Sequence, residues 1–105
     1  MTALDLRFDD LAEEHHVEAI GDGHAIQWIA DSVGDRVGVI EWHRDRRRPE
    51  FCCGGFVRFK HIDGKPWWTV RSWDPLTIEP SVLCSLEKGG CGEHGFIRQG
   101  RWVDA

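Results

Sequence analysis

The residues of this chain that are best suited to chemistry are cysteines and histidines in its second half. Cys91 and His94 have the C-x2-H spacing that lets two side chains of one tight turn reach the same tetrahedral ion. Cys84 lies upstream, and the intervening residues 87–90 suit a turn that brings it back to Cys91. Because thiolates and imidazoles together select zinc under reducing conditions, this pattern predicts a zinc site.

A second glycine-rich turn, residues 52–55 (CCGG), offers the fourth ligand. We favour Cys53, which directly precedes the glycines. Side chains alternate along an extended chain, so Cys52 would point to the opposite face. Cys52 and His43 stay open as alternatives for completing the site. The predicted zinc ligands are Cys53, Cys84, Cys91 and His94.

Disulfides and free structural thiols compete with the zinc interpretation. Disulfides need an oxidising compartment, and the N-terminal residues 1–10 lack the basic-then-apolar pattern of a signal peptide. The neighbours Cys52 and Cys53 are also poor partners for each other on geometric grounds. We therefore expect reduced cysteines, a zinc site and a cytoplasmic protein.

The motifs of common enzymes are missing from the sequence. It contains no P-loop, no G-x-S-x-G and no H-E-x-x-H. Asp74, which precedes Pro75, is interpreted as a turn residue and not as an acid catalyst. The prediction is that the protein is not an enzyme. A zinc hydrolase with three ligands, a bound water and Glu93 or Glu87 as base is a third alternative.

The elements that must position these residues are short strands. Segments rich in Val, Ile, Trp and Phe are separated by Gly, Asp and Pro, and no window shows a clean helical period. A mostly β fold follows, a small antiparallel β-sandwich or rolled sheet stabilised by a zinc knuckle. A helical turn is expected at Asp10–Glu14. Strands are expected at Leu4–Phe8, His16–Ile20, His24–Ala30, Arg36–His43, Phe56–His61, Pro66–Trp73, Leu76–Ile78, Phe96–Gln99 and Arg101–Val103.

Length and composition indicate one zinc-stabilised domain spanning residues 1–105. A chain of 105 residues has a limited core, so a metal staple would help it. No run approaches the roughly 18 apolar residues of a membrane-spanning helix. Six tryptophans are present without a tyrosine, and Trp28, Trp42, Trp68, Trp73 and Trp102 are expected to pack the core and cover the metal site.

Charge is unevenly distributed along the chain. The net charge is −5, and residues 1–35 hold nine acidic side chains against Arg7 alone. The densest basic run, Arg44–Arg48, is expected to be a solvated loop. Its alternative role is a contact with nucleic acid, helped by exposed tryptophans.

Two stretches carry a resemblance to known families. Residues 68–84, which contain the segment IEPSVLC, and residues 91–102 (CGEHGFIRQGRW) resemble small zinc-binding proteins of actinobacteria and their phages. They are similar, more distantly, to a bacterial domain of unknown function with a Cys/Gly knuckle, a leucine–serine–proline–serine strand and a C-x2-H turn. That group looks linked to bacterial ubiquitin-like conjugation operons. The resemblance covers residues 51–103 and implies zinc without supplying an activity.

These observations predict a small non-enzymatic zinc protein of phage or mobile-element origin. It would act as a protein-interaction module on a host or operon-encoded partner. Nucleic-acid binding through Arg44–Arg48 is the second hypothesis.

Overall fold

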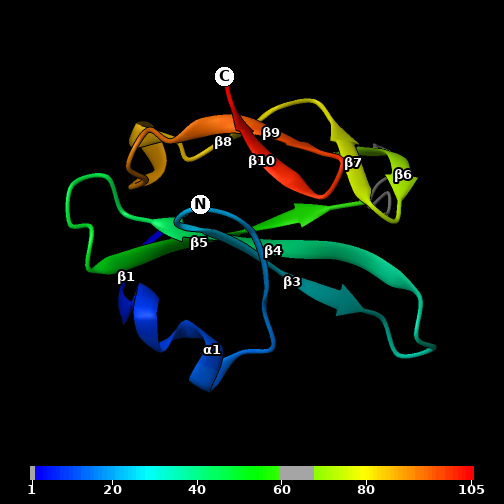
Figure 1. Cartoon of the computed structure of the whole chain (residues 1–105), viewed down its shortest axis with the longest axis horizontal. Helices are drawn as coiled ribbons and strands as arrows, with labels where there is room; N and C mark the ends of the chain where they lie inside the picture. The colour runs from blue at the N-terminus through cyan, green and yellow to red at the C-terminus, as the bar shows by residue number, and fades with distance from the viewer. Residues whose placement is uncertain (1, 60–67) are drawn as a thin grey trace.

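The chain folds into antiparallel β-sheets arranged in layers (Figure 1). The computed structural model describes residues 2–59 and 68–105. The larger sheet has five strands in the order β1-β5-β4-β3-β2. Its strands are β1 (Thr2–Arg7), β2 (Glu18–Gly21), β3 (His24–Ala30), β4 (Arg36–Arg44) and β5 (Phe51–Arg58).

Two smaller sheets come from the C-terminal half. A three-stranded sheet has the order β10-β9-β8, and β6 pairs with β7. In Figure 1 the three-stranded sheet lies above the five-stranded sheet and α1 lies below it. The bounds are β6 (Thr69–Trp73), β7 (Leu76–Glu79), β8 (Val82–Leu83), β9 (His94–Arg98), β10 (Arg101–Asp104), and for the helical turns η1 (Phe8–Asp10), α1 (Leu11–Glu14) and η2 (Leu86–Lys88).

The core is divided between the two faces of the five-stranded sheet. One cluster fills the space toward the smaller sheets and includes Val39, Val57 and Ile97, each with 0% exposure. The other cluster lies on the α1 side and contains Leu11, Trp42 and Cys52. Because successive strand residues face opposite sides, β4 and β5 contribute to both clusters.

The predicted fold class is confirmed: the described residues form mostly antiparallel strands. Predicted strands 24–30 and 36–43 correspond to β3 and β4, and the helical turn corresponds to η1 followed by α1. The predicted turn at residues 52–55 is wrong, because these residues lie inside β5. Gly54 belongs there because a Cβ at this position would lie 2.6 Å from the Trp42 ring. The ends of the predicted strands 56–61 and 66–73 lie partly outside the described residues.

The tryptophans pack less uniformly than predicted. Trp42 is buried on the α1 side, while Trp28, Trp68 and Trp102 are partly buried against the main core. Trp73 is 48% exposed, so its predicted core position is wrong. In the described part of the chain, no helix is both long and apolar enough to cross a membrane.

Candidate functional site

Strand register brings three metal-binding side chains into one row on the face of the larger sheet opposite α1. On β3 and β4, His24 pairs with His43, and on β4 and β5, His43 pairs with Cys53. Paired residues of antiparallel strands point to the same face. Cys53 therefore points toward the smaller sheets, whereas Cys52 belongs to the cluster on the α1 side.

The loop between β8 and β9 supplies two more thiols. Cys84 follows β8, the chain turns through η2, and Gly89 adopts a φ of 83° that favours glycine. A Cβ on Gly90 would lie 2.6 Å from the Cys84 sulfur, so this position also requires glycine. The Gly92 N–H donates to the Cys84 carbonyl at 2.8 Å and closes the loop. Cys84 and Cys91 are thereby held side by side.

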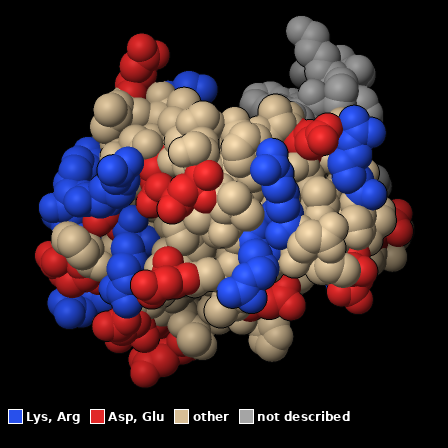
Figure 2. All heavy atoms as spheres, turned by 45° about the horizontal axis from the view of Figure 1, so that its top comes forward, with Lys and Arg blue, Asp and Glu red and all other residues tan. Residues whose placement is uncertain are grey.

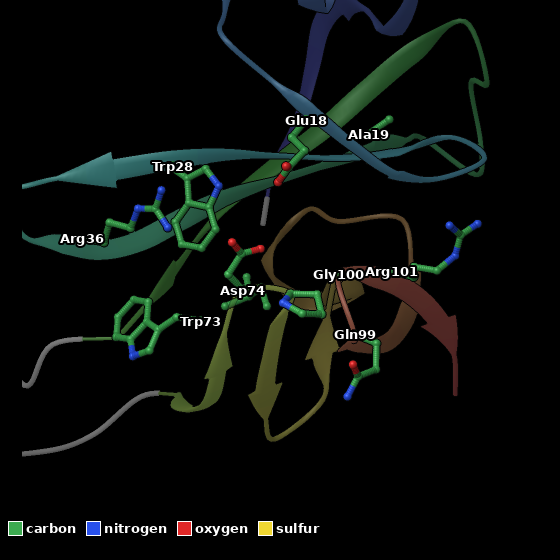
Figure 3. A pocket seen from close by; sticks show the side chains of 11 residues that line it. Glu18, Ala19, Trp28, Arg36, Trp73, Asp74, Gln99, Gly100 and Arg101 are labelled. Carbon is green, nitrogen blue, oxygen red and sulfur yellow. The ribbon is translucent and has the colours of Figure 1, made fainter.

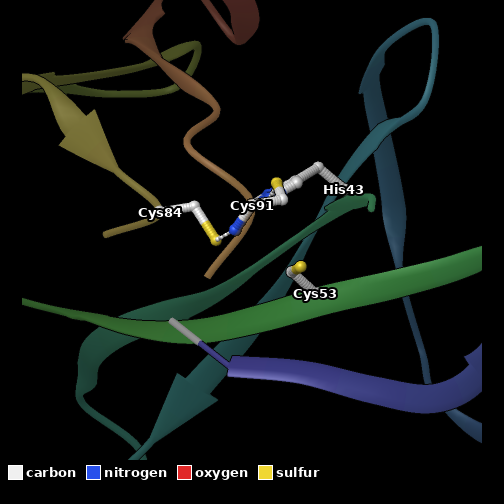
Figure 4. Close-up of side chains that lie close together, drawn as sticks. All are labelled: His43, Cys53, Cys84 and Cys91. Carbon is white, nitrogen blue, oxygen red and sulfur yellow. Dashed lines mark hydrogen bonds between the residues drawn. The ribbon is translucent and has the colours of Figure 1, made fainter. Parts of the chain in front are cut away.

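These elements converge on a buried cluster of three thiols and one imidazole (Figure 4). The ligand atoms of His43, Cys53, Cys84 and Cys91 all lie within 4.8 Å of one another. His43 Nε2 is 3.3 Å from Cys91 Sγ. A tetrahedral zinc ion with bonds of about 2.0 Å to nitrogen and about 2.3 Å to sulfur would separate such atoms by about 3.5 Å. The arrangement is compatible with a Cys3His metal site.

Backbone donors point at the sulfurs of this cluster. The Cys91 N–H donates to Cys84 Sγ at 3.3 Å. Burial alone would raise the pKa of Cys91, but the N–H groups of Arg46 and Glu93, with the His43 ring, outweigh it and lower that pKa. Burial and the neighbouring thiols raise the pKa of Cys53. The thiolate form is thus favoured at Cys91 relative to an ordinary cysteine, while Cys53 must lose its proton to an incoming cation.

His43 is oriented by a fully buried carboxylate, that of Glu41. The His43 Nδ1 atom lies 2.7 Å from Glu41 Oε2. Burial lowers the pKa of His43, but the hydrogen bond and charge of Glu41 outweigh it and raise the pKa to about 10. An Nδ1–H donated to Glu41 leaves Nε2 aimed at the thiols, which is the usual support of a metal-bound histidine.

The predicted ligands are distributed between two places. Cys53, Cys84 and Cys91 lie together, and the imidazole beside them belongs to His43. His43 is one of the two alternative ligands named from the sequence. Cys52 is separate, with its thiol donating to the Leu6 carbonyl at 3.2 Å. His94 is also outside the group.

His94 contacts a serine instead. Its Nε2 atom lies 2.8 Å from the Ser81 hydroxyl oxygen. That distance is within the range of a serine hydrogen-bonded to a general base. Within residues 2–59 and 68–105, His94 forms no ion pair with a carboxylate, so the described atoms form a dyad.

The β8–β9 pairing positions the dyad on the solvent side of the three-stranded sheet. Leu83 pairs with His94, so Ser81, two residues before Leu83, lies diagonally across from His94 on the same face. The Trp68 indole N–H donates to the Ser81 carbonyl at 3.3 Å and holds the backbone of that residue. The Phe96 ring stacks near the imidazole, with centroids 6.5 Å apart.

His94 also borders a cavity of about 410 Å³. Arg46, Glu93 and Asp104 line the same cavity. A second cavity of about 370 Å³ lies beside the Gln99–Gly100 turn, at the other end of β9 (Figure 3). Its described lining holds no serine, cysteine or histidine.

The basic run is largely neutralised by acidic partners. Arg44 lies 3.1 Å from Asp9, Arg48 lies 3.1 Å from Asp5, and Arg47 lies 3.2 Å from the buried Asp45. On the face shown in Figure 2, basic and acidic side chains are interspersed. Both observations favour the predicted solvated loop.

The comparison with protein families falls on the part of the chain that holds the dyad. A family model described as bacterial ubiquitination-like system serine protease (BubE) matches residues 51–105, which include Ser81 and His94. The chain belongs to the BubE family. The matched residues include 51–103, the stretch that carries the resemblance to a domain linked with ubiquitin-like conjugation operons. Neither a curated protein nor a solved structure matches the chain.

The BubE match corrects two predictions. The prediction of a non-enzymatic interaction module is wrong, because the family is described as a serine protease. The prediction that the protein is not an enzyme is wrong for the same reason. The sequence interpretation groups His94 with the thiols, whereas the structure places it beside Ser81. BubE membership does not bear on the resemblance to actinobacterial and phage proteins.

Sequence reasoning overlooked Ser81 and Glu41. Ser81 lies in a strand motif that the resemblance had already singled out, thirteen residues before His94. The signal that could have found it is this serine together with a histidine on the next strand. Glu41 could have been found from its place two residues before His43 on one strand face.

Proposed function

We propose that this chain is a serine peptidase with Ser81 as nucleophile and His94 as general base. The observation that carries the proposal is the 2.8 Å contact between Ser81 Oγ and His94 Nε2. The BubE match supports it, because the matched residues contain both side chains. The description of the family supports a substrate protein from a bacterial ubiquitination-like system, in keeping with an operon-encoded partner.

The dyad can perform acyl transfer with its own atoms. Ser81 Oγ attacks the scissile carbonyl carbon while its proton passes to His94 Nε2. When the tetrahedral intermediate collapses, the C–N bond breaks and His94 returns the proton to the leaving amine. A water molecule deprotonated by His94 then hydrolyses the ester and regenerates Ser81. Among the described residues, the His94 ring contacts the Ser81 hydroxyl and lies near the Phe96 ring.

We propose that His43, Cys53, Cys84 and Cys91 hold one zinc ion in a structural role. Four protein ligands close a tetrahedral site and leave no position for a reactive water. The site joins β4 and β5 of the larger sheet to the loop that begins three residues after Ser81 and ends three residues before His94. The ion would therefore fix the separation of the dyad residues and take no part in the chemistry.

A fluorophosphonate probe tests the nucleophile without knowledge of the substrate. Attack by a serine oxygen on phosphorus forms a phosphonyl ester and releases fluoride. The expected result is one adduct per chain, located on Ser81 by peptide mass spectrometry. Ser81→Ala should abolish labelling, and His94→Ala should slow it by about 10² or more, the usual contribution of a general base.

Ser85→Ala is the matched control for this experiment. Ser85 lies in the loop after Cys84 and its hydroxyl has no part in the dyad, so this variant should label at the wild-type rate. An adduct that persists in Ser81→Ala, or wild-type protein that does not react, would refute the proposal.

A further inference from the structure

A second group of ligating side chains lies apart from the thiols. The ligating atoms of His24, Glu93 and Asp104 all lie within 4.8 Å of one another. His24 comes from β3, Glu93 directly precedes β9, and Asp104 ends β10. Three elements that are distant in the sequence thus place one imidazole and two carboxylates around a common point.

The His24 ring is fixed with one nitrogen facing Glu93. The residue is only 7% exposed, and its Nδ1 atom lies 3.2 Å from Glu41 Oε1. An Nδ1–H donated to that carboxylate leaves the lone pair of Nε2 on the other side of the ring. Nε2 lies 3.9 Å from Glu93 Oε2, too far for a hydrogen bond and suited to an ion between them.

Glu41 supports both imidazoles at the same time. Its Oε2 atom faces His43 and its Oε1 atom faces His24, and the side chain is fully buried. A buried carboxylate with a histidine on each oxygen is the outer support that metal-bound histidines use. One side of Glu41 serves the thiol cluster, and the other side serves the His24 group.

Trp102 supports two members of the group. Its ring stacks on the His24 ring, with centroids 4.2 Å apart and planes at 12°. Its indole N–H donates to Asp104 Oδ1 at 2.9 Å, which leaves Oδ2 available. The histidine is therefore held by Glu41 and Trp102, and one carboxylate is held by Trp102.

The group has an approach from solvent. Glu93 and Asp104 line the cavity of about 410 Å³ that His94 also borders. Such a cavity can supply the water ligands that a site with three protein ligands requires.

We propose that His24, Glu93 and Asp104 form a binding site for a divalent transition-metal ion. One imidazole nitrogen and two carboxylate oxygens suit Mn²⁺, Fe²⁺, Co²⁺ or Zn²⁺, with water in the remaining positions. The donor set separates this site from the thiol cluster, because thiolates select zinc, whereas carboxylates suit harder ions such as Mn²⁺. The proposal is independent of Ser81 and of the proposed peptidase activity.

Mn²⁺ titration of the full chain, followed by electron paramagnetic resonance, tests the site. Mn²⁺ has little affinity for thiolates, so the as-purified protein can be used with its thiol cluster unchanged. The expected result is one bound Mn²⁺ per chain with a pulsed-resonance coupling to an imidazole ¹⁴N. Asp104→Asn and Glu93→Gln should each weaken binding by at least about tenfold, since loss of even an outer partner costs that much.

Glu87→Gln is the control, because it removes one exposed acidic charge from η2, outside the group. It should bind Mn²⁺ as the wild type does. The competing explanation is an ion-pair cluster in which protonated His24 faces two carboxylates. No binding below about 1 mM, the weak limit of functional divalent-cation sites, would overturn the proposal. So would binding that lacks the ¹⁴N coupling, or binding that all three variants retain.

Discussion

The hydroxyl of Ser81 lies 2.8 Å from His94 Nε2, whereas the imidazole that lies among the three thiols is that of His43. Cys84 follows Ser81 by three residues, and Cys91 precedes His94 by three residues. The loop between the thiols therefore carries the dyad at its two ends. The proposed metal site and the dyad therefore share this loop.

Loss of one thiol ligand should disturb both sites. Cys84→Ser should release the metal and lower the melting temperature by about 15 °C or more, because structural zinc contributes several kcal/mol and each kcal/mol shifts a domain of this size by about 5 °C. Fluorophosphonate labelling of Ser81 should fall with it. Metal analysis, thermal melting and labelling of the same preparation provide the check.

Cys52→Ser is the matched control for that prediction. Cys52 is as buried as the other thiols, but it faces the α1 side and donates to the Leu6 carbonyl. Its replacement should keep the metal and cost only about 1 kcal/mol, because the serine hydroxyl can still donate to the Leu6 carbonyl and the packing changes little. If Cys52→Ser lost the metal while Cys84→Ser kept it, the assigned cluster would be wrong.

Metal binding should be strongly dependent on pH. In the metal-free protein, Glu41 outweighs burial and raises the pKa of His43 to about 10, and burial raises the pKa of Cys53. Both groups hold a proton at neutral pH, and the ion must displace it. Each displaced proton makes the apparent affinity rise about tenfold per pH unit, so acid should weaken binding. Apparent zinc affinities measured by competition with a chelator at pH 6 and pH 7 should differ by at least about 100-fold, because at least these two protons are displaced. Equal affinities would contradict this account.

The arginines of the run 44–48 should differ in their effect on stability. Burial would raise the pKa of Asp45, but the hydrogen bonds and charge of Arg47 outweigh it and lower that pKa. A lowered carboxyl pKa gives stability that is present above the ordinary value of about 3.9 and is lost as the pH falls through the folded value. Arg47→Ala should therefore destabilise more than Arg46→Ala at pH 7, and the difference should shrink below about pH 4. Urea unfolding of both variants measures it, and equal losses at pH 7 would contradict the role given to Arg47.

The local sequence pattern is sufficient to predict much of the fold. Alternating apolar residues and glycine-rich turns predict β3 and β4, because these strands have one face against a core. The CCGG segment was interpreted as a turn, although it lies inside β5. Its glycines suggested a bend, whereas the space at Gly54 is taken by the Trp42 ring of the paired strand. That requirement depends on β4–β5 register, which the local sequence does not contain.

The candidate site depends on strand register even more than the fold does. Spacing alone links Cys91 with His94, since both lie in one short segment. In the structure, the pairing of β8 with β9 brings His94 beside Ser81 and not beside Cys91. His43 reaches the thiols only through its register with Cys53. Contacts between residues 48 positions apart, as between His43 and Cys91, follow from the assembled sheets and not from spacing.

The central claim is that His43 binds the metal whereas His94 serves Ser81 as general base. Measuring zinc content and fluorophosphonate labelling on the same protein tests this claim most directly. We expect His94→Ala to keep one zinc per chain and to lose labelling at Ser81. We expect His43→Ala to lose zinc and His43→Cys, which restores a fourth ligand, to regain it. If His94→Ala loses zinc while His43→Ala keeps it, His94 is a metal ligand and the account is contradicted.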